Sequence, residues 1–229
     1  EDDQETPSQF IVKDGKRWLR ILAENIPSVG YKVFEVRQGA GRSFSNEINV
    51  SGGVIENRFY KVTVDGRGAV TGLVDKTRGN RELAAEVHGR FINDLGPASG
   101  NVRIESEGPV STTLLASADS PLAHSTRITL FRDVDRIEIE NLITQNFNAT
   151  STWGFGFALQ NPDVHHEEVG AILRAKLTTD GGHYSPRNAR YDWLTLNHFV
   201  DLSGEGAGVT LSNADCYFMR VGNSTVEQL

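Results

Sequence analysis

The segment HSTRITLFRDVDRIEIENLITQNF, residues 124–147, decides the fold class of this chain. It holds two runs in which apolar and polar side chains alternate, and alternation with a period of two is typical of a strand with one buried face. The runs are joined by the polar tetrad Asp-Val-Asp-Arg at 133–136. We therefore predict an antiparallel β-hairpin here.

The same pattern recurs along the chain and predicts an all-β protein. Alternating segments separated by turn residues are WLRIL (18–22), YKVFEV (31–36), FYKVTVDGRGAVTGLVD (59–75) and GPVSTTLLAS (108–117). Within the third, Asp65-Gly66 and Gly68 mark a hairpin turn. Gly makes up 23 of the 229 residues, which suits many tight turns. Helical signals are weak, because Gly79 and Gly89 bracket the short run RELAAEV (81–87).

Composition shifts once along the chain. Residues 39–53, GAGRSFSNEINVSGG, are small and polar without clear periodicity, so we predict a linker there. It would follow the end of a small β module at 1–38 and precede a larger β domain at 54–229. So many antiparallel strands normally stack as two sheets, which predicts a sandwich.

The charge argues against two classes of partner. A formal net charge of −7, with no basic stripe, does not suit binding to a nucleic-acid backbone. The longest uncharged stretch, 141–162, is too rich in Thr, Asn, Gln and Ser for a membrane span.

The chain has a single cysteine, Cys216, which excludes an internal disulfide. Its neighbours Tyr217, Phe218 and Met219 predict a buried thiol.

Two clusters with acidic residues resemble a catalytic pair and a metal site, but we expect neither function from them. Glu138 and Glu140 would lie about 6.6 Å apart on one strand and point the same way, so they cannot flank a glycosidic bond; we expect a solvated face. The run HHEE, 165–168, offers two ligands on each face of a strand, whereas a zinc site needs three or four; we expect an exposed polar edge. We predict no catalytic residue, metal ligand or cofactor in this chain.

The loop at 181–193 is the best candidate for a binding site. Arg187, Tyr191, Asp192 and Trp193 supply the planar donors and aromatic faces that bind polyhydroxylated ligands. These four residues are the predicted substrate contacts. In the structural alternative, Arg187 pairs with Asp192 while Trp193 packs into the core.

Several segments, taken in order, resemble the C-terminal part of the α-mannosidases of glycoside hydrolase family 38. The matching segments are AENIPSVGYKVFEV (23–36), IENRFYKVTVDGRGAVTGLVDKTRGNREL (55–83), GPVSTTL (108–114), ITLFRDVDRIEIENLI (128–143), SPRNARYDW (185–193) and HFVDLSGEGAGVTLSN (198–213). The resemblance implies a large antiparallel β-supersandwich, similar to that of galactose mutarotase, after the last strands of a small β module. It also implies further strands beyond those present here.

In that family the zinc ion and the nucleophilic aspartate belong to an N-terminal catalytic domain. The resemblance therefore implies a retaining α-mannosidase in which this part supports and rims the active site. Its expected partners are mannosides and its own catalytic domain. Two alternatives stay open: a stand-alone carbohydrate-binding module with Trp193 stacked on a sugar, and a mutarotase-like epimerase that uses His166 or His183 with Glu168.

Overall fold

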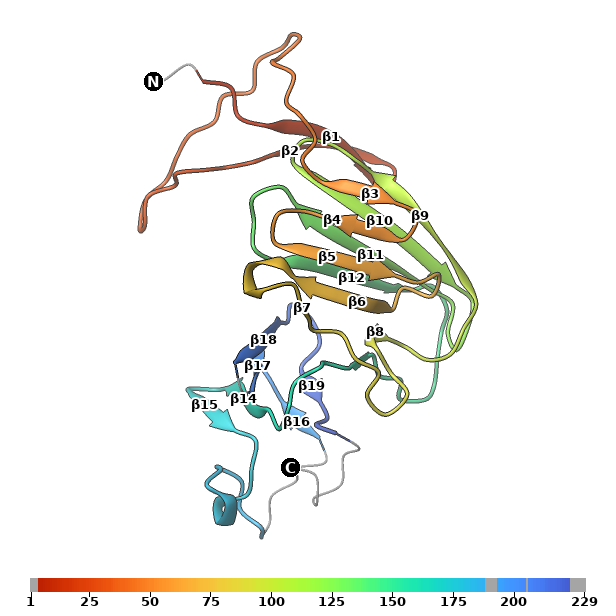
Figure 1. The fold of residues 1–229 in the computed structure, drawn as a ribbon, viewed down its shortest axis with the longest axis vertical. Helices are drawn as coiled ribbons and strands as arrows, with labels where there is room; N and C mark the ends of the chain where they lie inside the picture. Colours follow the sequence, from red (N-terminus) through yellow and green to blue (C-terminus); the bar gives the residue numbers. More distant parts are fainter. Residues whose placement is uncertain (1–3, 188–192, 205, 223–229) are drawn as a thin grey trace. The chain divides into compact units, whose positions relative to one another are not determined.

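The computed structural model describes residues 4–187, 193–204 and 206–222. The chain forms two compact units, residues 1–156 and 157–229, which are described separately below (Figure 1). Helix in the described part is confined to two 3-10 turns, η1 (Lys76–Arg78) and η2 (Thr178–Asp180). The prediction of an all-β, antiparallel fold is confirmed. No helix among the described residues is long and apolar enough to span a bilayer.

The first unit is built on two antiparallel sheets. The larger one has the order β13-β8-β6-β5-β4-β3, with β7 paired to β6. Its strands are β3 (Asn49–Ser51), β4 (Val54–Glu56), β5 (Tyr60–Val64), β6 (Val70–Asp75), β7 (Arg81–Glu82), β8 (Ile92–Asp94) and β13 (Gly154–Phe155). The hairpin predicted at 59–75 is thus confirmed as β5 and β6. Strand β3 lies within the segment that was expected to be a linker.

The second sheet contains the hairpin predicted at 124–147. Its order is β12-β11-β10-β9, formed by β9 (Gly100–Ser106), β10 (Ser111–Ala118), β11 (His124–Phe131) and β12 (Ile137–Ile143). The register pairs His124 with Ile143 and Leu130 with Ile137. Glu138 and Glu140 are exposed, as expected for the solvated face of β12.

The two sheets are joined by a buried apolar core and by side-chain hydrogen bonds. The core side chains include Ile55, Val62 and Val70 from the larger sheet and Leu114, Ile128 and Leu130 from the other. Asn57, which directly follows β4, donates from Nδ2 to the Phe131 carbonyl at 2.8 Å. Figure 1 shows β4, β5 and β6 lying across β10, β11 and β12.

An N-terminal hairpin, β1 (Ser8–Lys13) and β2 (Lys16–Ile21), docks on this unit through a buried amide. Gln9 is 8% exposed, and its Oε1 accepts from the backbone amides of Val110 and Ser111 at 2.8 Å each. Its Nε2 donates to the Ser111 carbonyl at 3.0 Å and to the Ser111 hydroxyl at 3.2 Å. One side chain therefore fixes the hairpin to the start of β10.

The prediction of a strand at 31–36 is wrong. Residues 22–48 form no strand, and Tyr31, Val33 and Val36 are 84%, 78% and 77% exposed. Alternation creates a potential apolar face, but a strand also needs a hydrogen-bonding neighbour, and the described residues supply none here.

The second unit has its own sheet and core. The sheet has the order β15-β14-β17-β18, and a two-stranded sheet pairs β16 with β19. The strands are β14 (Asp163–Glu168), β15 (Ala171–Arg174), β16 (Leu194–Thr195), β17 (Phe199–Gly204), β18 (Ala207–Ser212) and β19 (Phe218–Met219). Val164, Ala175, Leu194 and Val200 form the core. Cys216 is exposed, so the prediction of a buried thiol is wrong: its apolar neighbours do not enclose it.

Candidate functional site

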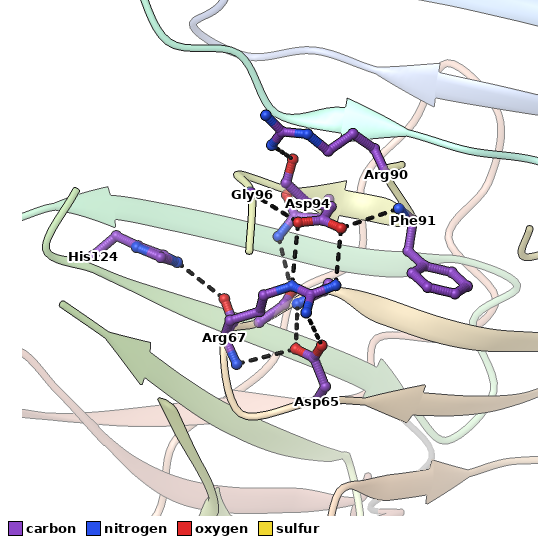
Figure 2. Close-up of polar contacts among 10 residues, drawn as sticks. Asp65, Arg67, Arg90, Phe91, Asp94, Gly96 and His124 are labelled. Carbon is purple, nitrogen blue, oxygen red and sulfur yellow. Dashed lines mark hydrogen bonds and ion pairs between the residues drawn. The ribbon is translucent and has the colours of Figure 1, made fainter. Parts of the chain in front are cut away.

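A buried polar cluster surrounds Asp94, the last residue of β8 (Figure 2). Asp94 is 1% exposed, and its carboxylate accepts two hydrogen bonds from Arg67, Nε to Oδ1 at 3.2 Å and Nη2 to Oδ2 at 3.0 Å. The backbone amide of Phe91 donates to Oδ2 at 3.1 Å, and that of Gly96 donates to Oδ1 at 2.9 Å. Both carboxylate oxygens are therefore occupied by two donors each.

Arg67 is presented by the turn between β5 and β6. Asp65 Oδ1 accepts from the amides of Arg67 at 3.0 Å and Ala69 at 3.1 Å, an arrangement in which an Asp side chain closes a turn. Gly68 adopts φ +87°, and a Cβ there would lie 2.6 Å from Thr126 Oγ1. The sequence Asp-Gly-Arg-Gly thus aims the guanidinium toward β8 while its backbone lies against β11.

Further contacts hold both ends of this ion pair. Arg67 Nη1 lies 3.2 Å from Asp65 Oδ2, so one guanidinium bridges two carboxylates. His124 Nε2 lies 3.0 Å from the Arg67 carbonyl, and Arg90 Nη1 donates to the Asp94 carbonyl at 3.0 Å. Figure 2 shows Arg67 between Asp94 and Asp65, with the His124 ring directed at the Arg67 backbone.

Asn93, next to Asp94, connects the cluster to the opposite sheet. It adopts φ +56°, in the left-handed region that non-glycine residues seldom occupy. Its side-chain amide exchanges two hydrogen bonds with that of Asn141 on β12, at 3.1 and 2.7 Å. The β8 end is therefore fixed within its own sheet and across the sandwich.

The electrostatics favour the ionised form of Asp94. Burial opposes the charge, but the hydrogen bonds from Arg67 and from the Phe91 and Gly96 amides outweigh it, so the pKa of Asp94 is lowered. A carboxylate that is ionised and fully hydrogen-bonded has no lone pair left to attack a substrate or to take a proton. The cluster can position the β8 loop; it is not built to act as an acid or a nucleophile.

The predicted contact loop is described only in part. Tyr191 and Asp192 lie outside the described residues, and with them the proposed pairing of Asp192 with Arg187. The Arg187 side chain is exposed, and its backbone amide donates to Ser185 Oγ at 3.1 Å. Trp193 is half-buried, with the Arg220 guanidinium 4.9 Å from its ring centroid.

The run HHEE is not an exposed edge, so that expectation is wrong. It forms most of β14, which lies between β15 and β17 in the sheet. His166 is 0% exposed; its Nδ1 lies 2.7 Å from the Thr195 carbonyl and therefore carries the proton, and its Nε2 lies 2.8 Å from the Tyr184 hydroxyl. Burial lowers the pKa of His166 and raises the pKa of Tyr184 to about 12.

His166 is 0% exposed and both of its ring nitrogens have hydrogen-bond partners, which argues against its use in the epimerase alternative. His183 Nδ1 also has a partner and accepts from the Arg174 amide at 2.7 Å. Within residues 4–187, 193–204 and 206–222, no group of three or more His, Cys, Asp or Glu side chains is arranged to hold a metal ion.

Sequence reasoning missed the Asp94 cluster. Its parts are a turn arginine and an aspartate 27 positions later, and two of the four donors are backbone amides. The one available signal is the lone acidic residue in the apolar stretch FINDLGP, 91–97, because a charge in such a setting is rarely buried unless it is paired.

Comparison with known proteins identifies the fold. No protein-family model and no curated protein matches the chain. Among solved structures, the chain is similar to an alpha-mannosidase from Enterococcus faecalis V583, with a TM-score of 0.59 and 12% sequence identity. The match covers 97% of this chain and 34% of that chain, so the chain spans about a third of the length of that protein. The chain thus has the fold of one part of an alpha-mannosidase.

Proposed function

We propose that this chain is the non-catalytic, C-terminal β region of an α-mannosidase, with the supersandwich architecture of galactose mutarotase. The observation that carries the proposal is the structural similarity along 97% of the chain to part of a known alpha-mannosidase. The ordered sequence resemblance described above points independently to the same family. In this proposal a separate catalytic domain holds the zinc ion and the nucleophile and hydrolyses terminal α-mannosides with retention.

The contacts of the described side chains favour a non-catalytic role for this region. Asp94 is saturated by four donors, and His166 is enclosed by Thr195 and Tyr184. Glu138 and Glu140 are exposed neighbours on one strand rather than a pair on opposite sides of a cleft. None of these groups is placed to cleave a glycosidic bond.

Two measurements test this proposal. The 229-residue chain, assayed with an aryl α-mannoside with and without added zinc, is expected to give no turnover. Turnover that is abolished by a chelator would overturn the non-catalytic role. The native reading frame should also encode an upstream region with an aspartate-rich metal site, and a complete frame without one would refute the assignment to a mannosidase.

We further propose that the loop containing Arg187, Tyr191, Asp192 and Trp193 contributes to the rim of the substrate site. Titration calorimetry with mannose oligosaccharides, comparing the native chain with Trp193→Ala, tests this separately. Weak heat that is lost in the variant supports the rim, whereas equal heat in both proteins excludes a role for Trp193. Strong, saturable binding by the chain alone would favour the stand-alone binding module.

A further inference from the structure

A hollow of about 310 Å³ opens in the first unit, between the end of β2 and the β11–β12 turn. Two arginines border it, Arg20 from β2 and Arg136 from the turn, and Phe131 also lines it. The two guanidinium carbons lie 5.4 and 5.3 Å from the centroid of the Phe131 ring. Residues from distant parts of the chain thus bring two cations to one aromatic side chain.

The charges around the hollow are unbalanced. Glu138 is the one carboxylate in its lining, and it is hydrogen-bonded to Arg136 Nη2 at 2.7 Å. Arg20 Nη1 donates to the neutral Ser111 hydroxyl at 2.7 Å. Within the described part of the chain, no carboxylate lies within ion-pair distance of Arg20. Among the described residues, Glu138 therefore acts on the Arg20 guanidinium only at longer range, and no carboxylate contacts it.

Arg20 is unfavourably placed for a charge without a counter-ion. It is half-buried, and this burial lowers its pKa, an effect that Glu138 only partly offsets. A bound anion would regain the lost solvation and use the free guanidinium donors. A carboxylate suits them best, because its two oxygens match the planar fork of a guanidinium.

The remaining lining is aliphatic and includes Ile21 and Val134. We propose that this hollow is a binding site for a carboxylate carried on a short apolar body, with Arg20 as its main charge partner. The site is independent of the proposed mannosidase role, because no residue of the loop at 181–193 lines the hollow. The carboxylate belongs either to a free organic acid or to an acidic side chain of a neighbouring polypeptide.

The test follows the Arg20 Nε–H signal by NMR while propionate is added to the full 229-residue chain. We expect a saturable shift with a dissociation constant in the millimolar range. Propionamide at equal concentration should leave the signal in place, because it has the same shape without the charge. A shift that grows linearly without saturation, or an equal shift with propionamide, would overturn the proposal.

Variants show whether the effect belongs to this hollow, with binding followed through the Phe131 ring signals. Arg20→Met should weaken propionate binding about tenfold or more, whereas Arg20→Lys should retain part of it. Arg17→Met is the matched control, because Arg17 lies on the same strand but stacks on Phe10, 3.8 Å from its ring centroid. Equal binding by the Arg20→Met and Arg17→Met proteins would refute the site.

A second ligand identifies the source of the carboxylate. Acetyl-glutamate amide carries the same group on a peptide backbone. If it binds more tightly than propionate, the site receives an acidic side chain; if it binds more weakly, the site receives a free acid. Either order supports a carboxylate site, and failure of both ligands to bind overturns it.

Discussion

Replacing Asp94 by Asn should destabilise the first unit by about 3 kcal/mol, because it breaks a buried ion pair from one side. The asparagine is neutral and retains one oxygen, which can still accept from one backbone amide and one Arg67 nitrogen, as Oδ1 does from Gly96 and Arg67 Nε. The amide group that replaces the second oxygen faces donors only. Removing one partner of a buried pair costs about 3–5 kcal/mol, and the lower end applies here because Arg67 keeps Asp65 at 3.2 Å.

Asp65→Asn provides the matched control. The Asp65 side chain is 27% exposed, against 1% for Asp94, and an asparagine retains the Oδ1 that closes the turn. Asp65→Asn should therefore lower the free energy of unfolding by only about 1 kcal/mol, as expected for a partly solvated ion pair. Combining Asp94→Asn with Arg67→Met should cost about 2 kcal/mol less than the sum of the two single changes, because the two side chains interact directly.

Urea denaturation of the full chain measures these free energies, and hydrogen exchange at the Phe91 and Gly96 amides locates the loss. The pH dependence is a second signature. The pKa of Asp94 is lowered from 3.8, so its stabilising effect is present above pH 3.8 and is lost as the pH falls through the folded-state value. The Asp94→Asn protein should lack the part of the acid-induced loss of stability that comes from protonation of Asp94. Equal costs for Asp94→Asn and Asp65→Asn, or additive effects in the double variant, would refute the reasoning.

Three further predictions concern other parts of the chain. The pKa of His166 is lowered from 6.5, so the unfolded chain binds a proton more readily than the folded one, and the fold loses stability as the pH falls below 6.5. His166→Gln should therefore reduce the fall in melting temperature on acidification. His198→Gln, at an exposed histidine, should not. Gln9→Leu should cost about 2–4 kcal/mol in urea denaturation by leaving two buried amides unpaired, and unchanged stability would show that the hairpin is held by other contacts. Gly68→Ala should cost more than about 2 kcal/mol, because a Cβ would meet Thr126 Oγ1 at 2.6 Å, whereas Gly79→Ala, with φ +69° and open space, should cost about 1 kcal/mol; similar thermal shifts for both would contradict the steric argument.

Hairpins with local signals were predictable from the sequence. In 59–75 and 124–147, alternation and turn residues lie within one short segment, and the structure forms β5–β6 and β11–β12 there. The segment 31–36 shows the limit of this reasoning. Its alternation is similar, but a strand forms only where another strand offers hydrogen bonds, and that depends on the rest of the fold.

The polar sites were harder to predict because burial depends on tertiary structure. Alternation placed His166 and Glu168 on one face of a strand, but it could not show that β17 and β15 flank that strand or that His166 is enclosed. The Asp94 cluster depends on backbone amides, which any residue except proline supplies. Side-chain patterns therefore carry almost no information about it.

Strand β12 ends its sheet, and its two glutamates are each 47% exposed. A terminal strand offers unpaired backbone groups to any other chain that adopts an extended conformation. Charged side chains on a terminal strand disfavour such pairing, because the added strand would have to desolvate them. Glu138 and Glu140 form ion pairs with Arg136 and Lys13, so the residues that imitate a glycosidase pair place a charged, solvated cluster on this edge.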